Sequence, residues 1–292
     1  MQKKRYVMCA VISNIIQDQI FDEERALYNL KSTTVIKCDF AGPKDGESAL
    51  KEARNINVDK CRFDLRYPLW HVDGFTVSNS EMTENCRAAL WYSRNGKIVD
   101  SSLEGIKALR ECENVHIRNC SVKSGEFGWK CNNISIENSA VEAEYLFLDT
   151  KDITFKNTRM KGKYSFQYTE NVTVKDCSLD TKDAFWHAKN VTVENCIVKG
   201  EYLAWFSENV VFKNCRIIGT QPLCYCKGLE LINCSMEDTD LAFEYSDVEA
   251  DVYGHVISIK NPKSGTITVD SIGEVIMENA VMDCSGVVKV RQ

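Results

Sequence analysis

A seven-residue phrase returns every nineteen residues along this 292-residue chain. Two well-preserved copies are Asn171-Val-Thr-Val-Lys-Asp-Cys177 and Asn190-Val-Thr-Val-Glu-Asn-Cys196. Further copies begin at Asn114, Asn133, Asp152, Asn209 and Gly228, and weaker ones begin at Ser32, Asn55, Gly74 and Asn95. A period this regular indicates stacked structural units, so the chain is expected to form a solenoid and not a closed globule.

The repeating unit alternates apolar and polar residues, which is the pattern of a half-buried strand. No segment within a unit is long and periodic enough for a crossover helix, so each strand must pair in parallel with its copy one coil further on. The sequence therefore predicts an all-β parallel β-helix with about nineteen residues per coil, about eleven coils and capped ends. A leucine-rich repeat, the alternative at this length, requires a Leu-rich consensus, whereas Val, Ile, Asn and Cys occupy the repeated places here.

Polar residues also repeat, and stacking explains them. The Asn at the head of the phrase is predicted to form a structural ladder, in which each side-chain amide bonds its copies above and below. Half of the 14 cysteines share one repeat place with Ser and Thr, which indicates small buried side chains in a stack. We therefore expect reduced cysteines, no metal site, no cofactor and a reducing, cytoplasmic location.

Composition narrows the classes of partner. The net charge is −6, the isoelectric point is about 5.4 and there is no basic stripe, so we expect no nucleic-acid partner. No run reaches the 18 to 20 apolar residues of a membrane span, so we expect no membrane partner. The N-terminal basic and apolar run lacks a clear cleavage site, which favours an alternative start over a signal peptide. We expect a monomer or a homodimer.

The repeat predicts one domain over residues 1–292. Within it we assign 1–16 as an extra N-terminal segment, 17–31 as a cap or short helix, 32–246 as repeat coils, and 247–292 as terminal coils with a C-terminal cap. An insertion after Phe40, with turn signals at Gly42-Pro43 and Asp45-Gly46, lengthens the first coil.

The other half of each coil contains a six-residue segment, such as Asp183-Ala-Phe-Trp-His-Ala188. Its fourth place holds Trp70, Trp91, Trp129, Trp186 and Trp205, with Arg110, Leu148, Gln167 and Cys224 in other coils. The sixth place is small, which suggests that it points inward. Strand alternation then predicts that the fourth place, Trp included, also points inward, and that the first, third and fifth places point outward. The opposite parity, with Trp outside and the fifth place inside, is the alternative.

The fifth place forms a row of mixed aromatic and charged residues, one per coil. We assign Glu111, Lys130 and Asp149 as candidate catalytic residues, and His71, Tyr92, Tyr168 and His187 as candidate ligand-binding residues. Exposed aromatic rings next to carboxylates and bases are typical of a sugar-binding groove, because rings stack on sugars while charged groups bind hydroxyls. The alternative is a face that packs under a loop or against another copy of the chain.

Several stretches resemble a bacterial family designated domain of unknown function 3737. They include Phe21–Tyr28, Gly42–Asn55, Tyr67–His71, Cys86–Ser93, Gly105–Cys112, Gly162–Thr173, Asp180–His187, Gly219–Cys226 and Asp238–Asp251. The resemblance covers roughly residues 18–290 and implies a right-handed parallel β-helix of the pectin-lyase-like superfamily. It implies no activity and no catalytic residues.

Two functions remain open from the sequence. The first is a non-catalytic scaffold that binds a glycan or another small ligand through the aromatic and charged row. The alternative is a polysaccharide-acting hydrolase or lyase of the pectin-lyase-like type, in which Glu111 and Asp149, about 10 Å apart at the backbone, flank the basic Lys130. The first is favoured, because Lys130 between the carboxylates disfavours a general acid.

Overall fold

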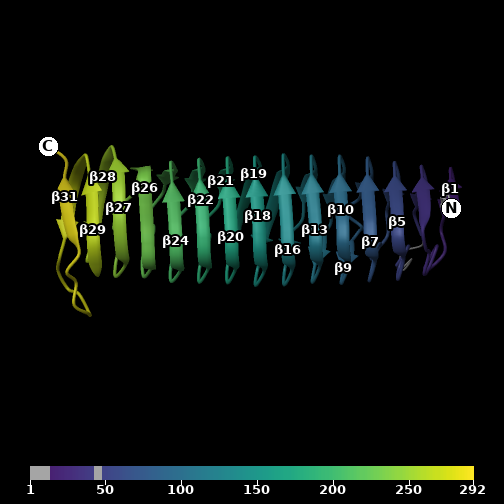
Figure 1. Cartoon of the computed structure of the whole chain (residues 1–292), viewed down its shortest axis with the longest axis horizontal. Helices are drawn as coiled ribbons and strands as arrows, with labels where there is room; N and C mark the ends of the chain where they lie inside the picture. Colours follow the sequence, from purple (N-terminus) through teal and green to yellow (C-terminus); the bar gives the residue numbers. More distant parts are fainter. Residues whose placement is uncertain (1–13, 43–47) are drawn as a thin grey trace, which may run out of the picture.

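The computed structural model describes residues 14–42 and 48–292 as one parallel β-solenoid without helices (Figure 1). It has about 14 turns of roughly 19 residues each. This exceeds the eleven coils that we expected, because regular strands continue through both terminal segments. Residues 1–13 and 43–47, which include most of the predicted extra N-terminal segment and the Asp45-Gly46 turn, lie outside the described residues.

Each coil has three sides. The first side carries the repeated phrase, in strands β1 (Asn14–Gln17), β3 (Thr33–Ile36), β5 (Arg54–Asp59), β7 (Asp73–Ser78), β10 (Arg94–Val99), β13 (Glu113–Arg118), β16 (Asn132–Glu137), β18 (Lys151–Lys156), β20 (Glu170–Lys175), β22 (Lys189–Glu194), β24 (Glu208–Lys213), β26 (Lys227–Glu237), β27 (Asp247–Tyr253), β29 (Ser264–Val269) and β31 (Val287–Val290). The second side follows a sharp corner, in β2 (Ile20–Phe21), β4 (Asp39–Phe40), β6 (Arg62–Phe63), β8 (Glu81–Met82), β11 (Ser102–Glu104), β14 (Ser121–Lys123), β17 (Ala140–Leu146), β19 (Arg159–Ser165), β21 (Ser178–Asp180), β23 (Ile197–Lys199) and β25 (Arg216–Ile218). The third side is mostly irregular and includes the short strands β9 (Leu90–Trp91) and β12 (Leu109–Arg110), while β15 (Glu126–Phe127), β28 (His255–Lys260) and β30 (Ser271–Ile276) complete the set.

The nineteen-residue period sets the register of the sheet. In the pairing of β20 with β22, Val172 lies opposite Val191 and Val174 lies opposite Val193. All four side chains are at most 1% exposed, which confirms the predicted inward places of the phrase. Because every coil places the same residue type at the same point, the core consists of stacks of like side chains.

The predicted Asn ladder is present, and it has a direction. At the head of the phrase, Asn190 Nδ2 donates to Asn171 Oδ1 at 3.1 Å, and Asn171 Nδ2 donates to Asp152 Oδ1 at 2.9 Å. A second ladder follows the corner after each first-side strand, for example from Asn195 to Asp176 at 2.9 Å. Among the described residues, each hydrogen bond of the two ladders runs from a side-chain amide to the coil on its N-terminal side. Since an ionised Asp accepts but cannot donate, each Asp ends the ladder on its N-terminal side.

The cysteines are reduced and inward, as predicted. All 13 cysteines among the described residues are free, and all but Cys284 are buried. Their sulfurs take the place of hydroxyls: the backbone N–H of Cys177 points to Cys196 Sγ at 3.3 Å, just as that of Cys120 donates to Ser139 Oγ at 3.0 Å. The repeat place therefore needs a small side chain with an acceptor atom, which explains why Cys, Ser and Thr interchange there.

The terminal segments form coils of their own. Strand β1 begins within the segment 1–16 that we assigned as extra, β2 lies within the assigned cap 17–31, and the two strands pair in parallel with β3 and β4. At the other end, β29 pairs with β31. In the part of the chain that the structure describes, no helix is long and apolar enough to cross a membrane.

Candidate functional site

The third side does not follow simple strand alternation. The third place is fully buried, as Leu69, Phe147, Phe166 and Phe185 show, whereas the Trp of the fourth place is half-buried at the surface. The prediction of inward Trp and outward third-place residues is therefore wrong, while the outward fifth place and inward sixth place are confirmed. The reason lies in the backbone: the third and fifth places repeatedly take left-handed φ values, such as 61° at Phe185 and 54° at His187, which interrupt the period of two.

The fourth-place row is largely structural. Trp70 stacks on Trp91 and Trp186 stacks on Trp205, with ring centroids 5.7 and 5.5 Å apart. Trp186 Nε1 donates to the carbonyl of Tyr202 at 2.6 Å, and Trp129 Nε1 donates to that of Tyr145 at 3.2 Å. Trp129, Trp186 and Trp205 therefore reach along the axis, and each satisfies a turn carbonyl of the next coil.

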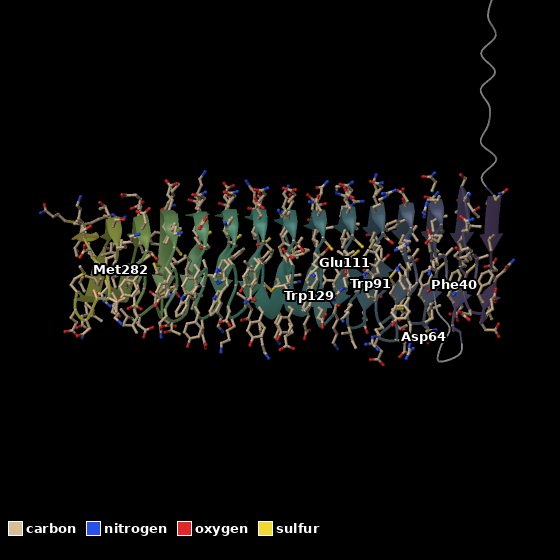
Figure 2. The ribbon with its side chains drawn as sticks, turned by 90° about the horizontal axis from the view of Figure 1, so that it is seen from below. Phe40, Asp64, Trp91, Glu111, Trp129 and Met282 are labelled. Atoms are coloured by element: carbon tan, nitrogen blue, oxygen red, sulfur yellow. The ribbon has the colours of Figure 1, made fainter. Side chains whose placement is uncertain are left out.

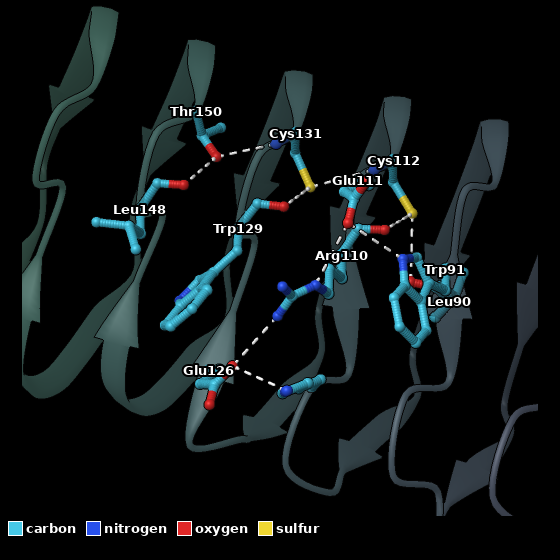
Figure 3. Close-up of polar contacts among 11 residues, drawn as sticks. Leu90, Trp91, Arg110, Glu111, Cys112, Glu126, Trp129, Cys131, Leu148 and Thr150 are labelled. Carbon is cyan, nitrogen blue, oxygen red and sulfur yellow. Dashed lines mark hydrogen bonds and ion pairs between the residues drawn. The ribbon is translucent and has the colours of Figure 1, made fainter.

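Trp91 and Trp129 lie near the middle of the solenoid (Figure 2), and Arg110 lies between their indoles (Figure 3). Its guanidinium carbon is 5.6 Å from the Trp91 ring centre and 5.3 Å from that of Trp129. Arg110 also pairs with Glu111 at 3.5 Å and with Glu126 at 3.3 Å. The sequence pattern did not predict this cluster, because strand alternation placed the fourth-place residues inside. A single Arg within a row of Trp was the available signal.

The fifth-place residues do form one outward row, in the predicted order. At its N-terminal end, the His71 ring meets Tyr92 edge-on at 5.1 Å, and His71 Nδ1 lies 3.0 Å from Glu52 Oε1. At the other end, Tyr168 and His187 stack at 4.9 Å. Six coil steps separate His71 from His187, a distance of roughly 29 Å, so the seven predicted residues do not converge on a single pocket.

The aromatic part of the row continues beyond the predicted residues. The stack from Tyr168 and His187 extends through Phe206 and Tyr225, with successive centroids 5.1 and 4.6 Å apart after His187. Tyr245, at the sixth place of the following coil, meets Tyr225 at a tilt of 43°. A ring inside such a stack has both faces covered and exposes only its edge. Tyr168 is the exception: its side toward Asp149 has no ring neighbour among the described residues, and the residue is 55% exposed.

The three charged residues differ in what they contact. Glu111 Oε1 accepts from Trp91 Nε1 at 3.3 Å and pairs with Arg110, so this carboxylate belongs to the structural cluster. The side chains of Lys130 and Asp149, in the next two coils, are exposed and make no hydrogen bond or close ion pair within residues 14–42 and 48–292, although the Asp149 carboxylate acts electrostatically on Lys151. Both charged side chains therefore face solvent in the two coils that precede Tyr168. We call these three residues the charged gap.

The two grooves along the corner of the solenoid lie away from the fifth-place row. Two shallow grooves of about 950 and 700 Å³ follow the corner between the first and second sides, and the row contributes no residue to either. Among the described residues, no group of three or more His, Cys, Asp or Glu side chains is placed to hold a metal ion.

Solved structures with similar folds have low sequence identity. The A-module of the mannuronan C-5 epimerase AlgE6 from Azotobacter vinelandii is 12% identical over 95% of this chain and 90% of its own, with a TM-score of 0.40. PfbA, a surface adhesin of Streptococcus pneumoniae, is 9% identical over 96% and 85%, with a TM-score of 0.44. The catalytic domain of a GH87 alpha-1,3-glucanase is 9% identical over 94% and 63%, with a TM-score of 0.31. At these values none of them carries a functional argument.

The family comparison is specific. No curated protein matches the chain. The model of a family described as protein of unknown function, DUF3737, matches residues 14–289, which is nearly all of the chain that the structure describes. This agrees with the resemblance carried by the sequence stretches, and the chain belongs to the DUF3737 family.

Proposed function

We propose that this protein is a non-catalytic scaffold that binds carbohydrate at the charged gap formed by Lys130, Asp149 and Tyr168. The observation that carries the proposal is the open face of Tyr168. It ends a stack of four rings, Tyr168, His187, Phe206 and Tyr225, and the exposed side chains of Lys130 and Asp149 in the two preceding coils make no hydrogen bond among the described residues. Sugar rings bind by laying their C–H faces on aromatic faces, and Tyr168 is the fifth-place ring that offers one.

The dimensions support one sugar ring at this position. Coils are spaced by about 4.8 Å, which falls within the 4.5–7 Å range at which ring centres stack. A ring on Tyr168 would therefore occupy the level of Asp149, whose short side chain leaves space above the solenoid surface. The Asp149 carboxylate and the Lys130 ammonium group then supply an acceptor and donors for ring hydroxyls.

A glycan array screened with the full chain tests the proposal, and titration calorimetry then measures the affinity for any glycan found. Tyr168→Ala should weaken binding about fivefold, as expected for loss of about 1 kcal/mol of ring stacking. The matched control is Phe206→Ala: Phe206 is also exposed, at 41%, but His187 and Tyr225 cover both of its faces. Equal effects of the two substitutions would contradict a site at Tyr168.

The charged residues are tested together as Lys130→Ala/Asp149→Ala. The double variant should keep its melting temperature within a few degrees and lose most of the binding. Glu111 is left intact, because removing it would strip a partner from Arg110 and Trp91. A double variant that folds and binds as the wild type does would show that these residues are only surface.

The alternative activity, a polysaccharide hydrolase or lyase, has less support from the row. A hydrolase needs a protonated carboxyl as general acid. Burial raises the pKa of Asp183, whose Oδ1 has no partner, but Asp183 occupies the first place of its segment and not the charged row. Release of reducing ends or of unsaturated sugars from any glycan bound in the screen would favour the enzyme over the scaffold.

A further inference from the structure

A polar groove runs along the corner between the first and second sides. The two grooves of about 950 and 700 Å³ share Asn119 and Ser121, so they form one continuous channel. The corner residues along it are Lys60, Asn79, Asp100, Asn119, Asn138, Asn157, Asp176 and Asn195. These eight coils are separated by seven steps, which gives a length of roughly 34 Å. We call this channel the corner groove.

The lining of the corner groove favours hydrogen bonding to an uncharged ligand. Carboxamides of the second Asn ladder form one rim, and exposed Ser121, Ala140 and Ser178 form much of the other. In the larger half the charged residues are Arg159 and Asp176, and in the smaller half Lys60 and Arg62 balance Glu81 and Asp100. No aromatic side chain lines either half, so stacking cannot be the basis of recognition here.

The direction of the Asn ladder leaves two acceptors side by side within this groove. Asn157 Nδ2 donates to Asn138 Oδ1 at 2.7 Å, which turns Asn157 Oδ1 toward the next coil. The next corner residue is Asp176, which accepts from Asn195 at 2.9 Å and has no proton to donate back. Asn157 Oδ1 therefore has no hydrogen-bond donor in the part of the chain that the structure describes.

Donors and acceptors without protein partners gather at this junction. The side chains of Arg159 and Ser178, on the opposite rim, make no hydrogen bond or ion pair within the described ranges. The same acceptor pairing recurs at Asn79 and Asp100, because Asn79 Nδ2 donates to Asp59 and Asp100 accepts from Asn119. Two such junctions in one groove require hydrogen-bond donors from outside the fold.

We propose that the corner groove is a binding site for a linear, uncharged, hydroxyl-rich chain, that is, a neutral glycan. Hydroxyl groups of the chain donate to Asn157 Oδ1 and to the Asp176 carboxylate, while the Arg159 guanidinium donates to hydroxyl or ring oxygens. The extended shape follows from lining residues that repeat at every coil. The uncharged character follows from the balance of charge along the groove. This site shares no residue with the charged gap and does not depend on the function proposed there.

One substitution removes the junction without removing a side chain. In Asp176→Asn, the new amide can donate to Asn157 Oδ1 and still accept from Asn195, so the ladder becomes continuous from Asn138 to Asn195. The matched control is Asp152→Asn, which closes the equivalent junction with Asn133 in the first ladder, outside the groove. Both variants should fold, and both should melt slightly higher than the wild type.

The probes are neutral hexasaccharides of β-1,4-, α-1,4- and β-1,3-linked glucose, with a hexauronate as the charged comparison, titrated into the full chain by NMR. We expect at least one neutral hexasaccharide to bind, with affinity reduced at least fivefold by Asp176→Asn and by Arg159→Ala. Asp152→Asn and Tyr168→Ala should leave this binding unchanged, which separates it from the charged gap. Binding of the hexauronate alone, binding of none of the four probes, or equal losses in Asp176→Asn and Asp152→Asn would overturn the proposal.

Discussion

The direction of the first Asn ladder predicts how substitutions at its junction change the stability of the fold, which can be measured without a ligand. Asn133 Nδ2 donates to Asn114 Oδ1 at 2.8 Å, and Asp152, one coil further on, accepts from Asn171 at 2.9 Å. Asn133→Asp removes the first of these hydrogen bonds, which is worth about 0.5–1.5 kcal/mol. It also places two carboxylates one coil apart, and at about 4.8 Å in water their repulsion adds about 0.9 kcal/mol.

The expected loss for Asn133→Asp is therefore about 2 kcal/mol, or a melting temperature lower by roughly 4–8 °C for a chain of this size. Asp152→Asn should act in the opposite direction, because the new amide donates to Asn133 Oδ1 and adds about 0.5–1 kcal/mol. The double variant Asn133→Asp/Asp152→Asn moves the junction by one coil without changing the number of ladder bonds. It should therefore unfold close to the wild type.

Thermal unfolding followed by circular dichroism, at low salt and at 1 M NaCl, measures all three variants. High salt should recover the repulsive part of the Asn133→Asp loss, because the screening length falls to about 3 Å. The central quantity is the coupling between the two substitutions, which the double-mutant cycle isolates. If the two single effects simply add, or if Asp152→Asn destabilises the protein, the ladder has no direction. The corner groove would then lack the pairs of unmatched acceptors on which the proposed glycan site depends.

Three further outcomes follow from the packing and the charges. Val193→Asp, at a position that is 0% exposed, should unfold the protein at a cost of several kcal/mol. Glu194→Ala, which removes a surface ion pair with Lys175, should leave the urea unfolding midpoint nearly unchanged, and equal effects would mean that the strand parity is wrong. Arg110→Lys should lower the free energy of unfolding by about 1 kcal/mol, because an ammonium group cannot both fill the space between two indoles and bind Glu126 as a guanidinium does. An unchanged midpoint of urea unfolding would contradict this prediction. The hydrogen bond from Asn95, followed by that from Arg94, lowers the pKa of Asp73 in the folded protein. The stability that ionised Asp73 contributes is therefore present above the unfolded pKa near 3.9 and is lost as the pH falls through the lower folded pKa. Asp73→Asn should make the free energy of unfolding less dependent on pH below about pH 4, and an unchanged pH dependence would refute the assignment.

The sequence by itself determined the architecture. A period of nineteen with Val at alternate places allows a single register, because a slip of one residue would turn every Val of the stack outward. The same repetition identified the Asn ladder, the inward cysteines and the outward row of the fifth place. Residues with no copy one coil away, such as Arg110, are not constrained by the repeat, and strand alternation misplaced Arg110 with the rest of the fourth place.

Only the tertiary structure decided what the third side exposes. Left-handed backbone at the third and fifth places turns Phe185 inward and both Trp186 and His187 outward, and alternation cannot foresee such a bend. Whether a ring offers its face or its edge depends on the ring in the next coil, so Tyr168 became distinct only once the stack was seen. The direction of the ladders is likewise a property of stacked coils. In the sequence, an Asp in place of an Asn is a conservative change. In a ladder whose amides all donate toward the N-terminus, the same change leaves two acceptors with no donor between them.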